Sequence, residues 1–411
     1  MKINLVILSS LLMLTGLVSF YACEKILPPE PDENEVLDGQ MEGLTHAQTR
    51  LFLEGDEAFS EVFTPEKGLG AYFVTSSCFT CHSGDGKGHP STTLTRFGRW
   101  ENGQFDPLTH LGGGQLQNRA IAGFEAEEIP AEANGIARFT PPAVTGLGLL
   151  AAIPDSTLLD LADPDDMDGD GISGRVNYIE PPDFFSPLQW HIPDGEGRYI
   201  GRFGKKAAAI DLLHQTVNAY KQDMGITSDF DMEDPINYAV SAQQTDLIPD
   251  PEISAATVQS VVFYLRTLKA PIPRDELGTN VQLGKQLFND IECSKCHLPT
   301  MKTGISDIEV LSEVEFHPYT DLLLHDMGEE LNDNYTEGIA EAAEWRTPPL
   351  WGLGLSPDAQ GGGYFLMHDG RATSIEEAIL LHGGEALNSR TNYEELSISD
   401  KEALIAFLES L

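Results

Sequence analysis

The sequence predicts an all-α protein built from two copies of one helical domain. Two short strings have the same design, Cys78-x-x-Cys81-His82 and Cys293-x-x-Cys296-His297. Further matches follow each string in the same order, and each copy ends in a segment with the apolar spacing of an amphipathic helix. These observations predict an internal duplication whose N-terminal copy is enlarged by a loop-rich insertion over residues 163–250.

Each Cys-x-x-Cys-His string is the attachment signature of a c-type haem. The two cysteines form thioethers with the porphyrin, and the adjacent His82 or His297 ligates the iron. A zinc knuckle and a redox dithiol use the same cysteine pair. Zinc would have to bring two distant strings together, and a dithiol needs no following histidine. We therefore expect two covalently attached haems in two cytochrome c-type domains.

The duplication rests on three matches between the halves. A phenylalanine stands five residues before the first cysteine of each string, a Thr-Pro-Pro segment leads to Gly-Leu-Gly-Leu in both halves, and an apolar segment closes each half. The matched pairs are Phe73 with Phe288, 138–149 with 346–355, and 261–268 with 404–411. Three matches in one order indicate one domain used twice.

The closing segments read as helices that cover a haem. Leu404, Phe407, Leu408 and Leu411 share one helical face, and Ser399 with Glu402 predicts a capping box. Residues 258–268 draw the same stripe, which Pro271 and Pro273 end. We place the haem domains at residues 46–270 and 277–411.

The N-terminus has the features of an export signal. Lys2 precedes an apolar run from Leu5 to Val18, which leads to Cys23. It resembles a bacterial lipoprotein signal, with residues 1–22 removed and Cys23 lipidated; a plain signal peptide with an incidental cysteine is the alternative. The run is short for a membrane span. We expect a periplasmic or outer-membrane-associated lipoprotein, with residues 23–45 as an acidic, proline-rich tether.

The charge balance excludes nucleic acid as a partner. Asp and Glu number 65 against 25 Lys and Arg, a formal net charge of −40. Such a surface can steer a cationic redox donor, although a solvated acidic face is an equally good interpretation.

The sixth ligand of each iron decides between electron transfer and reaction with peroxide. His382 follows an apolar helical stripe that begins near Ser374 and ends at Gly383. A histidine there can face a haem, or it can be an ordinary core residue. The other candidates in the C-terminal copy are His317, His325, Met327, Met367 and His368, and those in the N-terminal copy are His89 and His110.

One acidic loop has calcium-ligand spacing. Asp166, Asp168 and Asp170 alternate ahead of Gly171, as in the first half of an EF-hand loop. The acid expected at the twelfth position is replaced by Asn177. Calcium and an ordinary acidic turn are the two interpretations.

Several longer strings give the chain a family resemblance. They are residues 146–150, 163–174, 201–204, 319–328, 346–350, 368–378 and 382–386. With the two haem strings, they resemble the di-haem cytochrome c peroxidase and MauG superfamily, and more closely its di-haem oxidoreductase branch, sometimes labelled thiol oxidoreductase. In the peroxidases a Met ligates the C-terminal haem fourteen positions after the His of a His-Asp-Gly string. That count from His368 lands on His382, so the resemblance implies a bis-histidine C-terminal haem.

The resemblance implies an exported di-haem oxidoreductase of the cytochrome c peroxidase type. Electrons from a donor protein or small carrier would pass through the C-terminal haem to the N-terminal haem, where hydrogen peroxide or another small oxidant is reduced. No residue of the N-terminal copy matches the distal Glu of the peroxidases, so the catalytic residues stay unassigned. The alternatives are a pure electron carrier and MauG-like oxidation of a partner protein.

Overall fold

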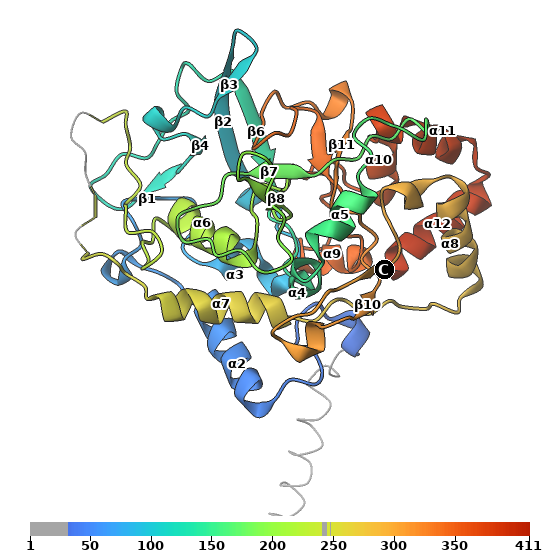
Figure 1. Ribbon diagram of the computed structural model, residues 1–411, viewed down its shortest axis with the longest axis horizontal. Helices are drawn as coiled ribbons and strands as arrows, with labels where there is room; N and C mark the ends of the chain where they lie inside the picture. Colours follow the sequence, from blue (N-terminus) through green and yellow to red (C-terminus); the bar gives the residue numbers. More distant parts are fainter. Residues whose placement is uncertain (1–31, 241–244, 247) are drawn as a thin grey trace, which may run out of the picture. The chain divides into compact units, whose positions relative to one another are not determined.

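The computed structural model describes residues 32–240, 245–246 and 248–411 (Figure 1). The predicted signal peptide, Cys23 and the first part of the tether lie outside these residues. Residues up to Val36 form one unit, of which the short helix η1 (Glu33–Glu35) is described, and Leu37–Leu411 form a second, compact unit. In the part of the chain that the structure describes, no helix is both long and apolar enough to cross a membrane.

The prediction of an all-α fold is wrong. The structure is mixed, with 35% of residues helical and 13% in strands. Its main sheet has the order β3-β2-β4, with β6 also pairing with β2. These strands are β2 (Leu94–Glu101), β3 (Gln104–Asp106), β4 (Gly114–Gln115) and β6 (Gly135–Phe139).

Two local signals explain this sheet. Asn102 and Gly103 both have positive φ, 53° and 77°, in the two-residue turn that joins β2 to β3. An Asn-Gly turn of this kind is a strong hairpin signal. In β6 the residues alternate between buried and exposed, but the buried ones include Gly135 and Ala137. Small buried residues make the strand period hard to see in the sequence.

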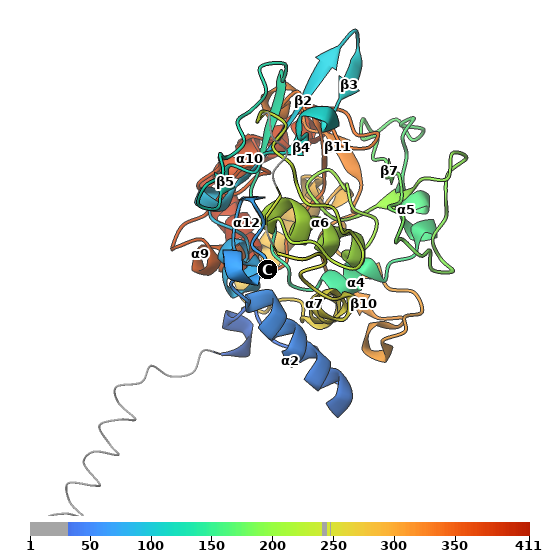
Figure 2. The same cartoon turned by 90° about the vertical axis from the view of Figure 1, so that its left-hand side faces the viewer.

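In both views the hairpin of β2 and β3 lies at the top of this unit, and the helices lie below it (Figures 1 and 2). The helices are α2 (His46–Ser60), α3 (Cys78–Cys81), α4 (Leu147–Ala151), α5 (Asp155–Leu161), α6 (Leu212–Met224), α7 (Ala255–Thr267), α8 (Thr279–Asp290), α9 (Ser356–Ala359), α10 (Ile375–Leu380), α11 (Leu387–Glu395) and α12 (Ile398–Ser410). The paired strands are β1 (Tyr72–Phe73) with β5 (Arg119–Ala120), β7 (Asn177–Ile179) with β8 (Tyr199–Gly201), β9 (Met301–Lys302) with β10 (Glu315–Phe316), and β11 (Leu324–Asp326) with β12 (Glu344–Arg346).

The same helix pairing occurs twice. Helix α2 packs on α7, and α8 packs on α12. A Cβ atom at Gly55 of α2 would collide with the carbonyl oxygen of Ser260, and one at Gly284 of α8 with that of Ala403. Glycine at the crossing therefore allows close backbone approach in both halves.

Equivalent aromatic clusters adjoin the two haem strings. The ring of Phe59 lies 5.3 Å from Tyr264 and 6.1 Å from His82. The ring of Phe288 lies 5.4 Å from Phe407 and 6.5 Å from His297. The counterpart of Phe288 is thus Phe59 of α2, and the sequence match with Phe73 is wrong.

The closing helices are α7 and α12. Val258, Val261, Val262 and Leu265 of α7 are buried, and Leu404, Phe407 and Leu408 of α12 are buried in the other half. The cap of α12 differs from the expectation, because Ser397 accepts the N–H of Asp400 and the helix begins at Ile398. The two helical stripes are as predicted.

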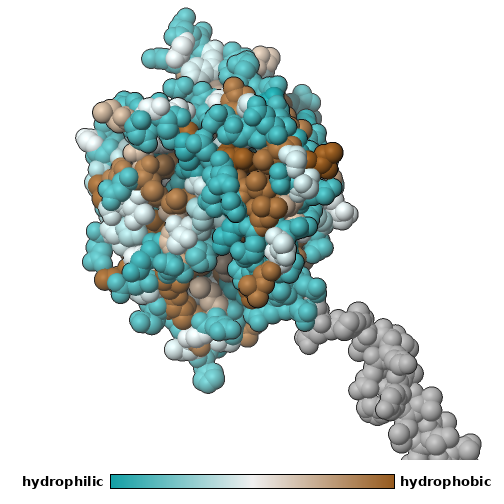
Figure 3. Space-filling view, turned by 90° about the vertical axis from the view of Figure 1, so that its right-hand side faces the viewer, coloured by the Kyte–Doolittle hydropathy of each residue, from teal (hydrophilic) through white to brown (hydrophobic). Residues whose placement is uncertain are grey.

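The largest core cluster spans both predicted haem domains. Met301, Leu311 and Phe316 belong to the same buried cluster as α6 and α7, whereas α8 and α12 share a second cluster. The division at residues 270–276 stays a prediction. On the face shown in Figure 3, hydrophilic side chains predominate and apolar ones form separate patches.

Candidate functional site

Both haem strings line one cavity. Its volume is about 880 Å³, near the upper end of the usual range for ligand pockets. Cys78, Cys81 and His82 contribute to its wall, as do Cys293, Cys296 and His297. Segments far apart in the sequence therefore enclose a space suited to large cofactors.

The N-terminal string folds as the single turn α3. Ser77 caps this turn by accepting the N–H of Thr80 at 3.1 Å. His82 follows, and its Nδ1 lies 2.8 Å from the carbonyl oxygen of Pro142. A carbonyl can only accept, so Nδ1 carries the proton and Nε2 keeps its lone pair. Burial lowers the pKa of His82 to about 4, which keeps the ring neutral at pH 7.

The C-terminal string repeats this arrangement. It forms the 3-10 turn η6 (Cys293–Lys295), and His297 Nδ1 lies 3.0 Å from the carbonyl oxygen of Tyr319. Burial lowers the pKa of His297 to about 4 as well. In both strings a backbone carbonyl thus fixes the tautomer that a metal ligand needs.

His382 faces His297 across the cavity. It follows α10, which Ser374 caps, and its Nδ1 donates to the carbonyl oxygen of Ala378 at 2.7 Å. The ring centres of His382 and His297 are 6.4 Å apart. Two metal–nitrogen bonds of about 2 Å, plus about 1.1 Å from each nitrogen to its ring centre, give about 6.2 Å. The pair therefore fits one metal ion between two imidazoles, and the ligand assignment itself stays a prediction.

Cations in the cavity fit the carboxylates of haem. Lys87, Lys205 and Arg346 line it. Within the described residues, no hydrogen bond or ion pair engages the ammonium group of Lys87 or Lys205. Burial lowers the pKa of Lys87 to about 8, and burial with the charges of Lys87 and Arg346 lowers that of Lys205 further. Buried cations without partners call for anions, and haem propionates are anions of the right kind.

Comparisons with known proteins agree with this geometry. The family model described as "Di-haem oxidoreductase, putative peroxidase" matches residues 133–411. The chain belongs to this family. The resemblance inferred from the sequence is thereby confirmed, and with it a general di-haem redox function.

Two solved structures are among those to which the chain shows a distant similarity. Hydrazine synthase of Kuenenia stuttgartiensis, pressurised with xenon, covers 91% of this chain and 94% of its own, with 13% identity and a TM-score of 0.35. A MauG-like protein associated with microbial copper homeostasis covers 65% of this chain and 89% of its own, with 16% identity and a TM-score of 0.32. No curated protein matches the chain.

The other C-terminal ligand candidates of this di-haem oxidoreductase differ in where they lie. His317 is exposed and forms a hydrogen bond with Thr300. It does not line the cavity. His368 lines the cavity, but its Nε2 is 2.8 Å from Asp333. Met327 and Met367 also line the cavity.

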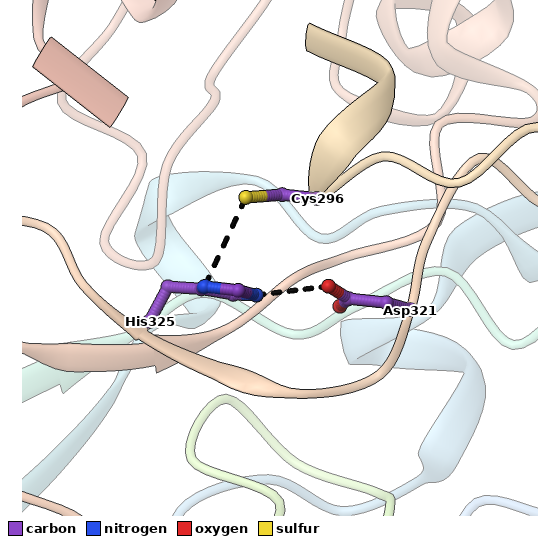
Figure 4. Close-up of side chains that lie close together, drawn as sticks. All are labelled: Cys296, Asp321 and His325. Carbon is purple, nitrogen blue, oxygen red and sulfur yellow. Dashed lines mark hydrogen bonds and ion pairs between the residues drawn. The ribbon is translucent and has the colours of Figure 1, made fainter. Parts of the chain in front are cut away.

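His325 has both ring nitrogens engaged (Figure 4). Its Nε2 lies 2.8 Å from Asp321 Oδ2, and its Nδ1 lies 2.7 Å from Glu385 Oε2 and 3.8 Å from Cys296 Sγ. Burial opposes a charge on this ring, but the bonds to Asp321, Cys296 and Glu385 raise the pKa of His325 above its ordinary value. His325 is thus an imidazolium held beside the C-terminal haem string, and neither nitrogen is free for iron.

The N-terminal ligand candidates lie outside the cavity. His89 is exposed and bonds Ser91, and His110 is exposed on η5 (Thr109–Leu111). The sequence interpretation missed His214 of α6, which lines the cavity. Its Nδ1 accepts the N–H of Ile210 at 3.3 Å, so the proton sits on Nε2. That tautomer is the opposite of the one in His82 and suits a hydrogen-bond donor rather than a metal ligand.

An aromatic stack stands in the cavity wall. The rings of Trp345 and His368 are parallel, 3.7 Å apart, and Lys206 Nζ lies 3.9 Å from the Trp345 ring centre. Trp345 Nε1 donates to the carbonyl oxygen of Leu331 at 2.9 Å. Trp345 is therefore firmly packed beside the haem space, whereas Trp351 packs on Phe316.

The predicted calcium loop is present but differs in membership. Asp163, Asp166 and Asp168 bring one ligand oxygen each within 4.8 Å of the others. Asp170 instead lies 3.3 Å from Lys295 of the C-terminal haem string. Calcium binding by Asp166, Asp168 and Asp170 stays a prediction.

Proposed function

We propose that this di-haem oxidoreductase reduces hydrogen peroxide or another small oxidant at the site of Cys78, Cys81 and His82. Electrons would come from an external donor by way of the site of Cys293, Cys296 and His297. Bound c-type haem supplies reversible one-electron chemistry and, where the iron lacks a sixth protein ligand, a place for a small oxidant. The chain's own residues would hold the haems and supply the protons.

The asymmetry of the two sites carries the proposal. His382 stands opposite His297 with the ligating tautomer. Among the described histidines that line the cavity, none stands in the same way opposite His82; His214 has the opposite tautomer. An iron with two protein ligands suits electron transfer, and an iron without a sixth protein ligand suits reaction with a small oxidant. The C-terminal haem would therefore transfer electrons, and the N-terminal haem would react.

Reduction of peroxide also needs protons. Hydrogen peroxide takes two electrons and two protons and gives two waters. Glu337 lines the cavity, with Oε1 3.8 Å from Arg96 Nε and 3.1 Å from the hydroxyl of Tyr335. Arg96 Nε is buried without a hydrogen-bond partner. We assign Glu337 as the residue that takes up and releases the protons. The guanidinium of Arg96 would stabilise its carboxylate form.

The test is to mix reduced holoprotein with hydrogen peroxide in a stopped-flow spectrometer. We expect one equivalent of peroxide to remove two electrons from each chain. Glu337→Gln should slow this by about 10²- to 10⁴-fold with unchanged haem content, since that is the usual contribution of a general acid. Reduced protein that stays reduced in peroxide would identify a pure electron carrier instead.

We further propose that the protein is exported and anchored by lipid at Cys23. The support is the apolar N-terminal run ending at that cysteine, together with haem strings that are loaded outside the cytoplasm. Cys23→Ala should release the protein from the membrane fraction. Retention of the variant in that fraction would contradict the lipid anchor.

A further inference from the structure

A second group of carboxylates lies at the end of the predicted insertion and just beyond it, and none of its members lines the haem cavity. Asp234, Asp250 and Glu252 bring one ligand oxygen each within 4.8 Å of the others. Asp246 lies near this group, four residues before Asp250 in the chain, and its charge acts on both Asp234 and Glu252. All four residues belong to the segment between α6 and α7.

Three oxygens of this group have no partner. Asp234 Oδ1, Asp246 Oδ2 and Glu252 Oε1 are buried and make no hydrogen bond with any described residue. Asp246 as a whole is 6% exposed. A buried carboxylate oxygen without a partner is costly, and such orphaned groups are rare in folded proteins. The orphaned oxygens therefore point to a bound cation.

The described side chains nearby do not supply that cation. The positive charge of Lys221 acts on Asp234, but both oxygens of Asp231 already hold its Nζ at 2.8 Å. Burial, with repulsion from Asp250, Asp246 and Glu252, raises the pKa of Asp234 to about 7.

We propose that Asp234, Asp246, Asp250 and Glu252 bind a calcium ion. Calcium takes six to eight oxygen ligands at about 2.3–2.6 Å, so two oxygens on one ion lie at most about 5 Å apart. The 4.8 Å spread of the three ligand oxygens satisfies this limit. Magnesium needs a tighter octahedron and keeps most of its water.

Thr227 prepares the site. Its backbone N–H donates to Glu252 Oε2 at 2.6 Å, and its hydroxyl donates to Asp250 Oδ1 at 2.6 Å. Thr227 is fully buried, so these bonds fix two of the four carboxylates before any ion arrives. The buried Thr227 thus holds Glu252 and the exposed Asp250 in position.

The loop that contains Asp163 differs in just this respect. Its carboxylates already accept backbone N–H groups, such as Met167 to Asp163 at 2.8 Å and Gly171 to Asp166 at 3.2 Å. Within the described residues, none of its oxygens is buried without a partner. It therefore serves as a matched control.

An ion here would brace the wall of the N-terminal haem site. Thr227 follows α6, and Ser254, two residues after Glu252, caps α7. Tyr220, Asp223 and Met224 at the end of α6 line the haem cavity. Calcium would thus link the end of α6 to the start of α7, and both helices contribute to this wall.

The experiment uses the full holoprotein, stripped with EGTA and titrated with calcium chloride by calorimetry and thermal unfolding. We expect a saturable site and a higher Tm with calcium. Asp246→Asn and Glu252→Gln should each weaken that site by about tenfold or more, because affinity follows the count of charged ligands. Asp168→Asn should leave it unchanged.

Two results would overturn the proposal. One is unaltered protein without calcium-binding heat or Tm shift. The other is binding that Asp168→Asn abolishes while Glu252→Gln and Asp246→Asn retain it, which would place the ion in the Asp163 loop. Since the unaltered protein is itself titrated, a variant that fails to fold does not remove the test.

Discussion

Replacing His382 by alanine removes the imidazole that faces His297. The 6.4 Å between these rings leaves room for one metal ion and nothing larger along that line. Without His382, the far side of the C-terminal iron position faces open cavity. We expect one haem in each chain to change from low spin to high spin, and the count of low-spin haems to fall by one.

The substitution should leave the fold intact. His382 contributes one hydrogen bond, from Nδ1 to the carbonyl oxygen of Ala378. Such a bond adds about 1 kcal/mol of net stability, a small part of what holds a domain. A changed spectrum would therefore report the ligand and not unfolding.

Electron paramagnetic resonance and visible spectra of the oxidised variant make the measurement. Added imidazole should enter the vacated space and restore the low-spin signal. The matched control is His317→Ala, which removes an exposed histidine that bonds only Thr300. An unchanged spectrum in His382→Ala would refute the assignment and make Met327 the next candidate.

Three further changes have defined outcomes. Asp155→Ala should lower the free energy of unfolding by about 3–5 kcal/mol in denaturant titrations, because it leaves the buried guanidinium of Arg202 without its carboxylate partner. The control Glu394→Ala, which breaks an ion pair at the surface, should lower it by less than about 0.5 kcal/mol. Equal losses of stability in the two variants would contradict this reasoning. Burial raises the pKa of Glu127 from 4.5 to about 7, so the folded protein keeps a proton that the unfolded chain loses and stability falls as pH rises through this window. Glu127→Gln should lessen that fall by up to about 3 kcal/mol between pH 4.5 and 7, and an unchanged slope would exclude Glu127 as its source. Lys205→Met should lower a haem reduction potential in spectroelectrochemical titration, because a nearby positive charge favours the reduced iron, and an unchanged potential would place that cation away from both haems.

The haem strings and the closing helices could be predicted because their signals are local. Cys-x-x-Cys-His is a covalent motif, and the apolar stripes of α7 and α12 repeat with the helical period. The capping serine was misplaced by two residues, since Ser397 and Ser399 both precede the helix body. His382 was found from its position after a helical stripe.

The main sheet could not be recognised from apolar alternation, because Gly135 and Ala137 fill buried positions of β6. The Asn102-Gly103 turn was an available signal, and it was overlooked. The cation cluster was inaccessible for another reason. Lys87, Lys205 and Arg346 come from distant segments, and only the tertiary fold places them on one cavity.

The most direct test of the division between the two haem sites is electron paramagnetic resonance of the unaltered, oxidised holoprotein. It counts high-spin and low-spin iron at the same time. The structure predicts one low-spin haem, held between His297 and His382, and one high-spin haem at His82. Two low-spin haems that are inert to peroxide would contradict the proposed reaction site.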